Sequence, residues 1–333
     1  MKFLRIASCL VLFVAGFSPA LAADRLSPSV RALVSADEPL KVAVDRGFAV
    51  RDGRVQVVVL ATQAGVEHVE RWLTDRGARF VFAYGDRIQA FVPPDLVAEL
   101  EGRADVLEVE RPLYARPPEP VPPAAAARPK LLAVTSEGVE PINVPAWHAE
   151  GFAGEGLKIG VIDVEFGGWD DLLGVELPPA GRTTYRAFGG SSAAADQVHG
   201  TACAEIVHDV APDADLFLAH IRTLGDFYAS LDWMASEGVD VVTMSVGWFG
   251  AGPGDGTGNS ADRVNAFVAA ADALFFTSAG NERRSHWQGA SADADADGWV
   301  DFEPGDNLNE LVSTMAADDR VAVSMVWSCL LYT

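Results

Sequence analysis

The segment Arg111–Lys130, RPLYARPPEPVPPAAAARPK, divides the chain into two parts. Proline lacks a backbone N–H and fixes φ, so this density of prolines prevents regular structure and is typical of an extended, exposed linker. The chain has 333 residues, more than one domain usually contains, and its 49% hydrophobic content is ample for a substantial core. We therefore expect folded units over 27–112 and 131–333, joined by a linker over 113–130.

The part before the linker alternates short strand patterns with helical patterns. The expected elements are a strand at 55–62, a helix at 65–77, a hairpin of 78–84 and 87–92 around Gly85-Asp86, a short helix at 93–102 and a strand at 105–111. The order βαββαβ predicts a small α+β domain of the ferredoxin-like kind.

Residues 1–22 have the pattern of a cleaved secretory signal. Lys2 and Arg5 precede an apolar run of about a dozen residues, and Ala20 and Ala22 supply the small residues of a cleavage site. We expect the mature protein to be extracellular or periplasmic. No later apolar stretch is long enough to span a bilayer, so no membrane anchor is expected.

The formal net charge of −22 is concentrated after the linker. Residues 131–333 carry 8 Lys and Arg against 31 Asp and Glu, whereas residues 1–130 carry 17 against 16. An acidic unit of this kind repels nucleic acid and anionic membranes, so we expect neither as a partner.

The part after the linker alternates apolar strand patterns with helical patterns. Strands are expected at 156–163, 214–221, 239–247 and 273–281, with helices beginning at His199 and covering 227–238 and 261–272. This alternation predicts an α/β fold, a mostly parallel sheet with helices on both faces. Active sites of such sheets lie at the carboxyl ends of the strands.

Three polar residues are expected at that edge. Asp163 ends the strand KIGVID, His199 opens a helix of small residues, and Asn281 follows the apolar strand of TSAGNE. A carboxylate beside His199 would fix its tautomer and stabilise the imidazolium, and an asparagine amide can donate to a developing oxyanion. Taken singly, Asp163 is often only a helix cap or turn residue, His199 fits a structural histidine better, and Asn281 indicates no more than a turn.

Together the stretches VIDVEFGG, HGTACAEIV, VVTMSVGW and TSAGNE resemble, in order, four motifs of the subtilisin-like serine proteases (subtilases, peptidase family S8). The resemblance covers residues 140–285. It implies a secreted serine endopeptidase with a subtilisin-like fold that hydrolyses peptide bonds through an Asp-His-Ser triad. The implied roles are Asp163 as orienter, His199 as general base, Asn281 as oxyanion donor, and Ser245, Val246 and Gly247 as a strip that pairs with a polypeptide substrate. The domain at 27–112 resembles the family's inhibitory propeptide, an expected partner of the protease unit.

The sequence departs from the family at the nucleophile. No Gly-Thr-Ser segment occurs, and Ser313 in VSTMAAD has neither the preceding glycine nor the following proline. We expect that the chain stops before the nucleophile serine and that the 333 residues are catalytically silent. Val164 and Glu165 stand where most members have Thr-Gly, which places the chain in a divergent branch.

The acidic stretch SADADADGWVDFEPGD suggests a second site. Its aspartates alternate before Gly298 as in a calcium loop, but Pro304 stands where an EF-hand has its bidentate glutamate. A structural Ca²⁺ site and a solvated acidic loop both remain open, and no cofactor is required for catalysis. The candidate ligands are Asp293, Asp295, Asp297 and Asp301.

Two other functions compete with that of a serine protease. A zinc protease is excluded because His199, Glu205 and His208 do not form His-Glu-x-x-His. The alternative that stays open is a non-catalytic secreted module, either a peptide-binding pseudoprotease or a calcium-stabilised adhesion domain.

Overall fold

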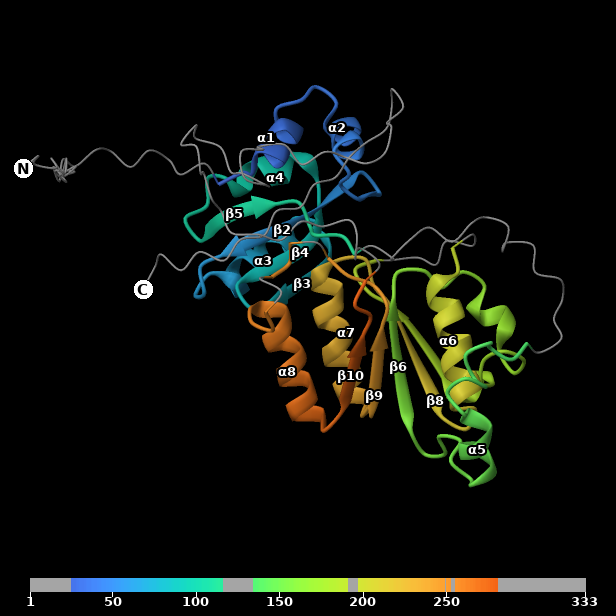
Figure 1. Ribbon diagram of the computed structural model, residues 1–333. Coiled ribbons are helices and arrows are strands. Elements are labelled where there is room, and N and C mark those ends of the chain that lie inside the picture. Colours follow the sequence, from blue (N-terminus) through green and yellow to red (C-terminus); the bar gives the residue numbers. More distant parts are fainter. Residues whose placement is uncertain (1–24, 116–133, 191–196, 249, 253–254, 281–333) are drawn as a thin grey trace, which may run out of the picture. The chain divides into compact units, whose positions relative to one another are not determined.

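The computed structural model describes residues 25–115, 134–190, 197–248, 250–252 and 255–280. It divides into two compact units, Met1–Arg111 and Pro112–Thr333, whose elements are labelled in Figure 1. The expected signal at 1–22 and most of the expected linker lie outside the described residues.

The first unit contains the expected βαββαβ series. Its elements are β2 (Arg54–Ala61), α3 (Val66–Asp75), β3 (Arg79–Tyr84), β4 (Arg87–Val92), α4 (Pro94–Leu100) and β5 (Val106–Glu110). The four strands lie in the order β5-β2-β4-β3, and all neighbours are antiparallel. This is a small α+β arrangement of the ferredoxin-like kind.

The first unit also has elements that the sequence patterns did not indicate. They are α1 (Pro28–Val34), α2 (Pro39–Asp45) and β1 (Val50–Arg51). Each helix spans only seven residues, too few for an amphipathic period to stand out. Val30 and Leu33 of α1 are nevertheless fully buried in the core of the unit.

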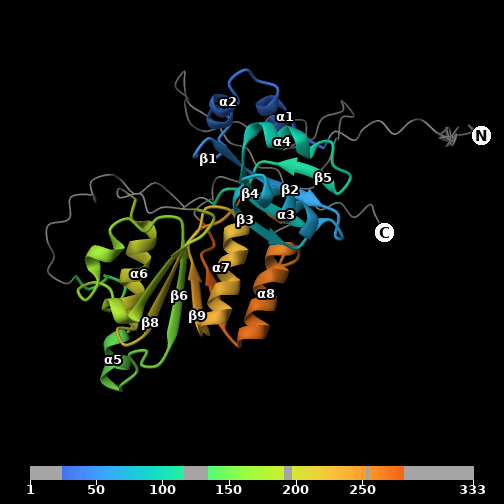
Figure 2. The ribbon, with the colours of Figure 1, turned by 180° about the vertical axis from the view of Figure 1, so that it is seen from behind.

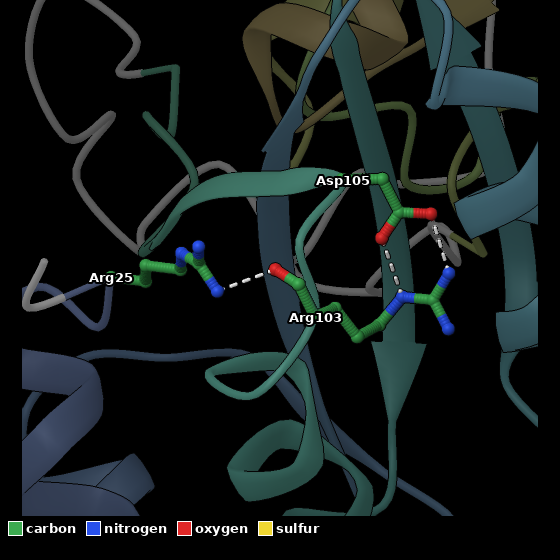
Figure 3. A network of polar contacts seen from close by, with 3 residues as sticks. All are labelled: Arg25, Arg103 and Asp105. Atoms are coloured by element: carbon green, nitrogen blue, oxygen red, sulfur yellow. Dashed lines mark hydrogen bonds and ion pairs between the residues drawn. The ribbon is translucent and has the colours of Figure 1, made fainter. Parts of the chain in front are cut away.

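Hydrogen bonds of Arg25 and Arg103 connect the beginning of the described chain to the loop before β5 (Figure 3). Arg25 donates to the carbonyl oxygens of Glu101 and Arg103, at 2.9 and 2.6 Å. The Arg103 guanidinium in turn donates two bonds to Asp105, at 2.9 and 2.6 Å. Bidentate pairs of this kind hold both partners in one orientation, so the loop has a fixed shape.

The second unit is built on a five-stranded parallel sheet in the order β10-β9-β6-β8-β7. The strands are β6 (Lys158–Asp163), β7 (Thr183–Ala187), β8 (Asp215–His220), β9 (Val241–Met244) and β10 (Leu274–Thr277). The helices are α5 (Val144–Ala149), α6 (His199–Val210), α7 (Leu224–Glu237) and α8 (Asn259–Ala271), with short 3₁₀ turns η2 (Trp169–Leu172) and η3 (Ala180–Arg182). The predicted α/β class is confirmed.

Alternate side chains of a strand point to opposite faces, so this sheet has apolar side chains on both faces. Helices cover both of them. Val161 of β6 and Leu218 of β8 are buried with Ala204 of α6. On the opposite face the Phe217 and Trp233 rings lie 5.8 Å apart, which packs β8 against α7. Figure 2 shows α7 beside α8.

The turn between β8 and α7 is fixed by a capping box. The Thr223 hydroxyl accepts a bond from the Asp226 amide, and the Asp226 carboxyl accepts one from the Thr223 amide, both at 3.1 Å. Gly238, in a left-handed conformation with φ of 67°, ends the helix.

No helix in the described part of the chain has the length and apolar character needed to cross a bilayer.

Candidate active site

The expected site edge is formed by the carboxyl ends of four parallel strands. Asp163 is the last residue of β6, and the register places it opposite His220, the last residue of β8. The Asp163 carbonyl accepts a bond of 2.9 Å from the Ile221 amide. On the other side, the Ser278 amide after β10 donates to the Met244 carbonyl at the end of β9, at 3.1 Å. Polar residues after these strands therefore meet at one edge.

Asp163 is fully buried, and its carboxyl group is fixed at both oxygens. Oδ2 accepts a hydrogen bond of 2.8 Å from Nδ1 of His199. Oδ1 accepts bonds from the backbone amides of Val164 and Glu165, at 2.7 and 3.3 Å. The two residues that replace the usual Thr-Gly thus still orient the carboxyl group, because they do so through their backbone.

His199 is held by the first turn of α6. The amides of Gly200 and Thr201 donate to the Glu165 carbonyl, at 2.7 and 3.2 Å, which joins the helix start to the loop after β6. A Cβ atom at Gly200 would lie 2.6 Å from Cβ of Asp163 and 2.7 Å from the Glu165 carbonyl oxygen. Only glycine allows the helix to approach this closely.

The surroundings favour the charged form of His199. The hydrogen bond to Asp163 raises the pKa of His199 above its usual value, burial opposes this, and the charges of Asp163 and Glu165 add to the increase. The side chain is 17% exposed, so it retains contact with solvent. With Nδ1 bound to Asp163, Nε2 is the nitrogen that can exchange a proton with a reacting group.

His220 is a second histidine at this edge that the sequence analysis did not single out. It is 1% exposed, and its Nδ1 lies 2.8 Å from the Tyr185 hydroxyl. Burial lowers the pKa of His220 to about 4, against a smaller opposing effect of the Val164 backbone. It is therefore neutral at pH 7. Its place at the end of the strand pattern ADLFLAH was the signal that could have identified it.

Cys203 lies one helical turn after His199. Its sulfur and ligand atoms of Asp163 and His199 lie within 4.8 Å of one another, the one group within the described ranges close enough to hold a metal ion. Burial, and then the charge of Asp163, raise the pKa of Cys203 to about 12. A protonated thiol is a poor nucleophile, and Cys203 packs against the hydrophobic core of the second unit.

The expected substrate strip directly follows β9. Val246 is 4% exposed, while Ser245 is half-buried and Gly247 is exposed. The next residue, Trp248, places its ring 5.3 Å from that of Phe227 in α7. The remaining expected site residues, together with the serine considered as nucleophile, lie outside the described residues; they are Asn281, Asp293, Asp295, Asp297, Asp301 and Ser313.

Comparisons with known proteins give one family match and similar solved structures. A model of the subtilase family matches residues 154–324. Similar solved structures are the epidermin leader peptide processing serine protease (EpiP) of Staphylococcus aureus and a mutant of it, each 11% identical, with TM-scores of 0.40 and 0.41. The alignments cover 68% and 66% of this chain and 60% and 59% of theirs, so the chain spans less than two thirds of these relatives. No curated protein matches the chain.

Proposed function

The chain belongs to the subtilase family, and on this premise we propose that it is the hydrolytic part of a secreted serine endopeptidase. The match covers both residues of the Asp163–His199 pair. The single observation that carries the proposal is the 2.8 Å bond from Nδ1 of His199 to the buried Asp163, because this contact prepares an imidazole for proton transfer.

In the proposed reaction, Nε2 of His199 takes the proton of a serine hydroxyl as that oxygen attacks the peptide carbonyl. Asp163 holds the imidazole in the tautomer that leaves Nε2 unprotonated, and it stabilises the imidazolium that forms. Asn281 donates to the oxyanion of the tetrahedral intermediate. Removing one such donor typically costs about 10²–10³ in rate. His199 then returns the proton to the leaving amine.

The substrate in this proposal is an extended polypeptide. It pairs through its backbone with Ser245, Val246 and Gly247, which directly follow β9, the strand that pairs with β6 as far as Ile162, next to Asp163. Buried Val246 anchors this strip, and exposed Gly247 leaves room for an incoming backbone.

Residues 27–112 are proposed to inhibit the protease unit until the linker at 113–130 is cut. The first unit has its own hydrophobic core, as a separable inhibitor requires. Residues 27–112 carry 11 Lys and Arg against 14 Asp and Glu, a net charge of −3, so their repulsion from an acidic partner is weak. The signal at 1–22 would direct secretion, and a Ca²⁺ ion bound by the aspartates of 293–301 would serve stability.

The mechanism also needs a nucleophile. No serine within the 333 residues lies in a Gly-Thr-Ser segment, so no residue here is assigned that role. A second candidate function is a non-catalytic module that captures extended peptides along the same strip, because such capture needs only the backbone of Ser245, Val246 and Gly247. The two candidates predict the same fold and different chemistry, so a chemical probe separates them.

The test begins with the coding DNA read beyond codon 333 in every frame. Where a Gly-Thr-Ser segment follows, the protein extended to include it should react with a fluorophosphonate and cleave casein. His199→Ala should reduce cleavage by at least about 10³-fold. The 333-residue chain itself should remain unlabelled. If no such segment exists in any frame, the peptidase proposal is wrong and the peptide-binding module is favoured.

A further inference from the structure

The loop that follows β6 determines where both members of the Asp163–His199 pair lie. Its Val164 and Glu165 amides donate to Oδ1 of Asp163, at 2.7 and 3.3 Å. The Glu165 carbonyl accepts a bond of 2.7 Å from the Gly200 amide, directly after His199 at the start of α6. A displacement of this loop would therefore change the orientation of the carboxyl group and the place of the helix together.

His220 lies beside this loop. The register pairs it with Asp163 on the neighbouring strand, so the two side chains point to the same face of the sheet. The imidazole forms a hydrogen bond with the Val164 backbone, and this bond raises the pKa of His220 against the larger effect of burial. A bond that raises the pKa of an imidazole is donated by the ring, so its acceptor is the Val164 carbonyl. Val164 thus holds Asp163 through its amide and is held by His220 through its carbonyl.

The Tyr185 hydroxyl fixes the tautomer of His220. It lies 2.8 Å from Nδ1 of the ring. Burial lowers the pKa of His220 to about 4, so at pH 7 the imidazole is neutral and has one N–H donor and one acceptor nitrogen. A ring that donates to Val164 therefore accepts the hydroxyl proton at Nδ1 and donates from Nε2. With both nitrogens occupied, the ring has one orientation toward the loop.

Aromatic contacts join the same two residues to the rest of the segment that follows β6. The Phe166 ring is fully buried, and its centroid lies 5.9 Å from the ring centroids of Tyr185 and His220. Trp169 stacks on Tyr185, with 4.8 Å between the ring centroids. Aromatic pairs at these separations are attractive and have preferred orientations. His220 and Tyr185 thus contact this segment at Val164, Phe166 and Trp169.

Packing alone does not account for a histidine at this position. His220 is 1% exposed, and an apolar side chain of similar size would fill the same volume without the cost of burying two ring nitrogens. An apolar residue cannot supply a donor for the Val164 carbonyl or an acceptor for the Tyr185 hydroxyl. These two bonds connect β7 and β8 to the loop that orients Asp163.

We propose that His220 and Tyr185 are positioning residues for the proton-transfer pair, because they fix Val164, whose amide orients the Asp163 carboxyl group toward His199. The role of this positioning in catalysis rests on the proposed function. The orientation of the pair does not, so it can be measured in a chain without an assigned nucleophile.

The experiment records the Nδ1 proton of His199 by NMR in the ¹⁵N-labelled full chain, because the chemical shift of this proton reports the hydrogen bond to Asp163. His220→Phe keeps an aromatic ring against Phe166 and removes both hydrogen bonds of the imidazole. In this variant the proton signal should move upfield, and the pKa of His199 should fall by at least about 0.5, because the hydrogen bond to Asp163 weakens. Tyr185→Phe, which removes only the hydroxyl, should change both quantities in the same direction by less.

Phe217→Leu is the matched control. Phe217 lies in the same strand as His220 and packs against Trp233 of α7 on the opposite face, with the rings 5.8 Å apart. Its replacement should lower the free energy of unfolding in urea and leave the proton signal and the pKa of His199 unchanged.

The proposal is overturned if His199 responds to Phe217→Leu as it does to His220→Phe, or if neither His220→Phe nor Tyr185→Phe changes the His199 signals. If His220→Phe does not fold, Tyr185→Phe alone decides. These results are independent of the fluorophosphonate test, so a failure of the peptidase proposal and a failure of the positioning proposal can be told apart.

Discussion

His199 donates a 2.8 Å hydrogen bond from Nδ1 to Oδ2 of Asp163, a residue that is 36 positions earlier and fully buried. The contact joins the end of β6 to the start of α6. Because both oxygens of Asp163 are occupied by donors, the imidazole has one orientation in which its second nitrogen faces away from the carboxyl group. The same hydrogen bond therefore fixes the orientation of the His199 ring and raises the pKa of His199.

Replacing Asp163 with asparagine should lower the pKa of His199, because the hydrogen bond to Asp163 is the largest contribution that raises it. An NMR pH titration of the His199 ring in the full chain measures this, with the His148 ring as internal control. A pKa raised by folding stabilises the native state fully below the unfolded value of 6.5, and this gain is lost as pH rises through the folded value. The variant should therefore lose most stability at low pH. Identical His199 titrations in both proteins would contradict the assignment.

Gly200→Ala should destabilise the second unit by about 1–3 kcal/mol, the usual cost of overpacking. The new Cβ would meet Cβ of Asp163 at 2.6 Å and a backbone oxygen at 2.7 Å, and neither can move freely. Alanine normally favours a helix over glycine, so a loss of stability would be a steric effect. Gly181→Ala is the control, because a Cβ there meets nothing within 4 Å. Urea unfolding measures the free energy of unfolding of both variants. An equal loss in Gly200→Ala and Gly181→Ala would exclude the steric explanation.

His220 should make the protein sensitive to acid. Its folded pKa of about 4 lies below the unfolded value of 6.5, so the neutral form stabilises the protein above pH 6.5, and this contribution is lost as pH falls toward 4. The size is on the order of 3 kcal/mol. His220→Gln should show a smaller loss of unfolding free energy between pH 7 and pH 4.5 than the unaltered chain. The exposed His68→Gln should behave as the unaltered chain does. If His220→Gln loses as much unfolding free energy between pH 7 and pH 4.5 as the unaltered chain, other groups are responsible for the acid sensitivity.

Cys203 should resist alkylation in the folded protein. With a pKa of about 12, its thiolate fraction at pH 8.5 is roughly 0.03%, and the thiolate is the reactive form. Iodoacetamide should modify Cys203 at least about a hundredfold more slowly in buffer than in urea, as followed by mass spectrometry of its peptide. Equal rates would indicate an exposed or activated thiol.

The sequence was sufficient for features that a local pattern defines. The strands of the parallel sheet that are buried on both faces, such as β6 and β8, have uninterrupted apolar runs, and the small residues after His199 marked the helix that packs at the strand end. Chain order then brought Asp163 and His199 to one edge, because parallel strands place their carboxyl ends together.

Other features could not be predicted from the sequence, because they depend on residues that are far apart in the chain. Strand β7 has the sequence TTYRA and pairs on one side only, within the described sheet, so most of its side chains are not buried and no apolar run marks it. The lowered pKa of His220 comes from its burial in the packed fold, and its hydrogen-bond partner, the Tyr185 hydroxyl, is 35 residues away in the sequence.

The absence of a side chain at Gly200 also determines when the Asp163–His199 pair can form. Until α6 reaches the end of β6, the histidine and the aspartate remain apart, and Asp163 would be buried without its partner only at a cost of several kcal/mol. Docking of the helix and formation of the proton-transfer pair are therefore a single event in time. In a protein with the proposed activity, a half-folded molecule would lack its general base, because the step that completes the packing of α6 also forms the Asp163–His199 pair.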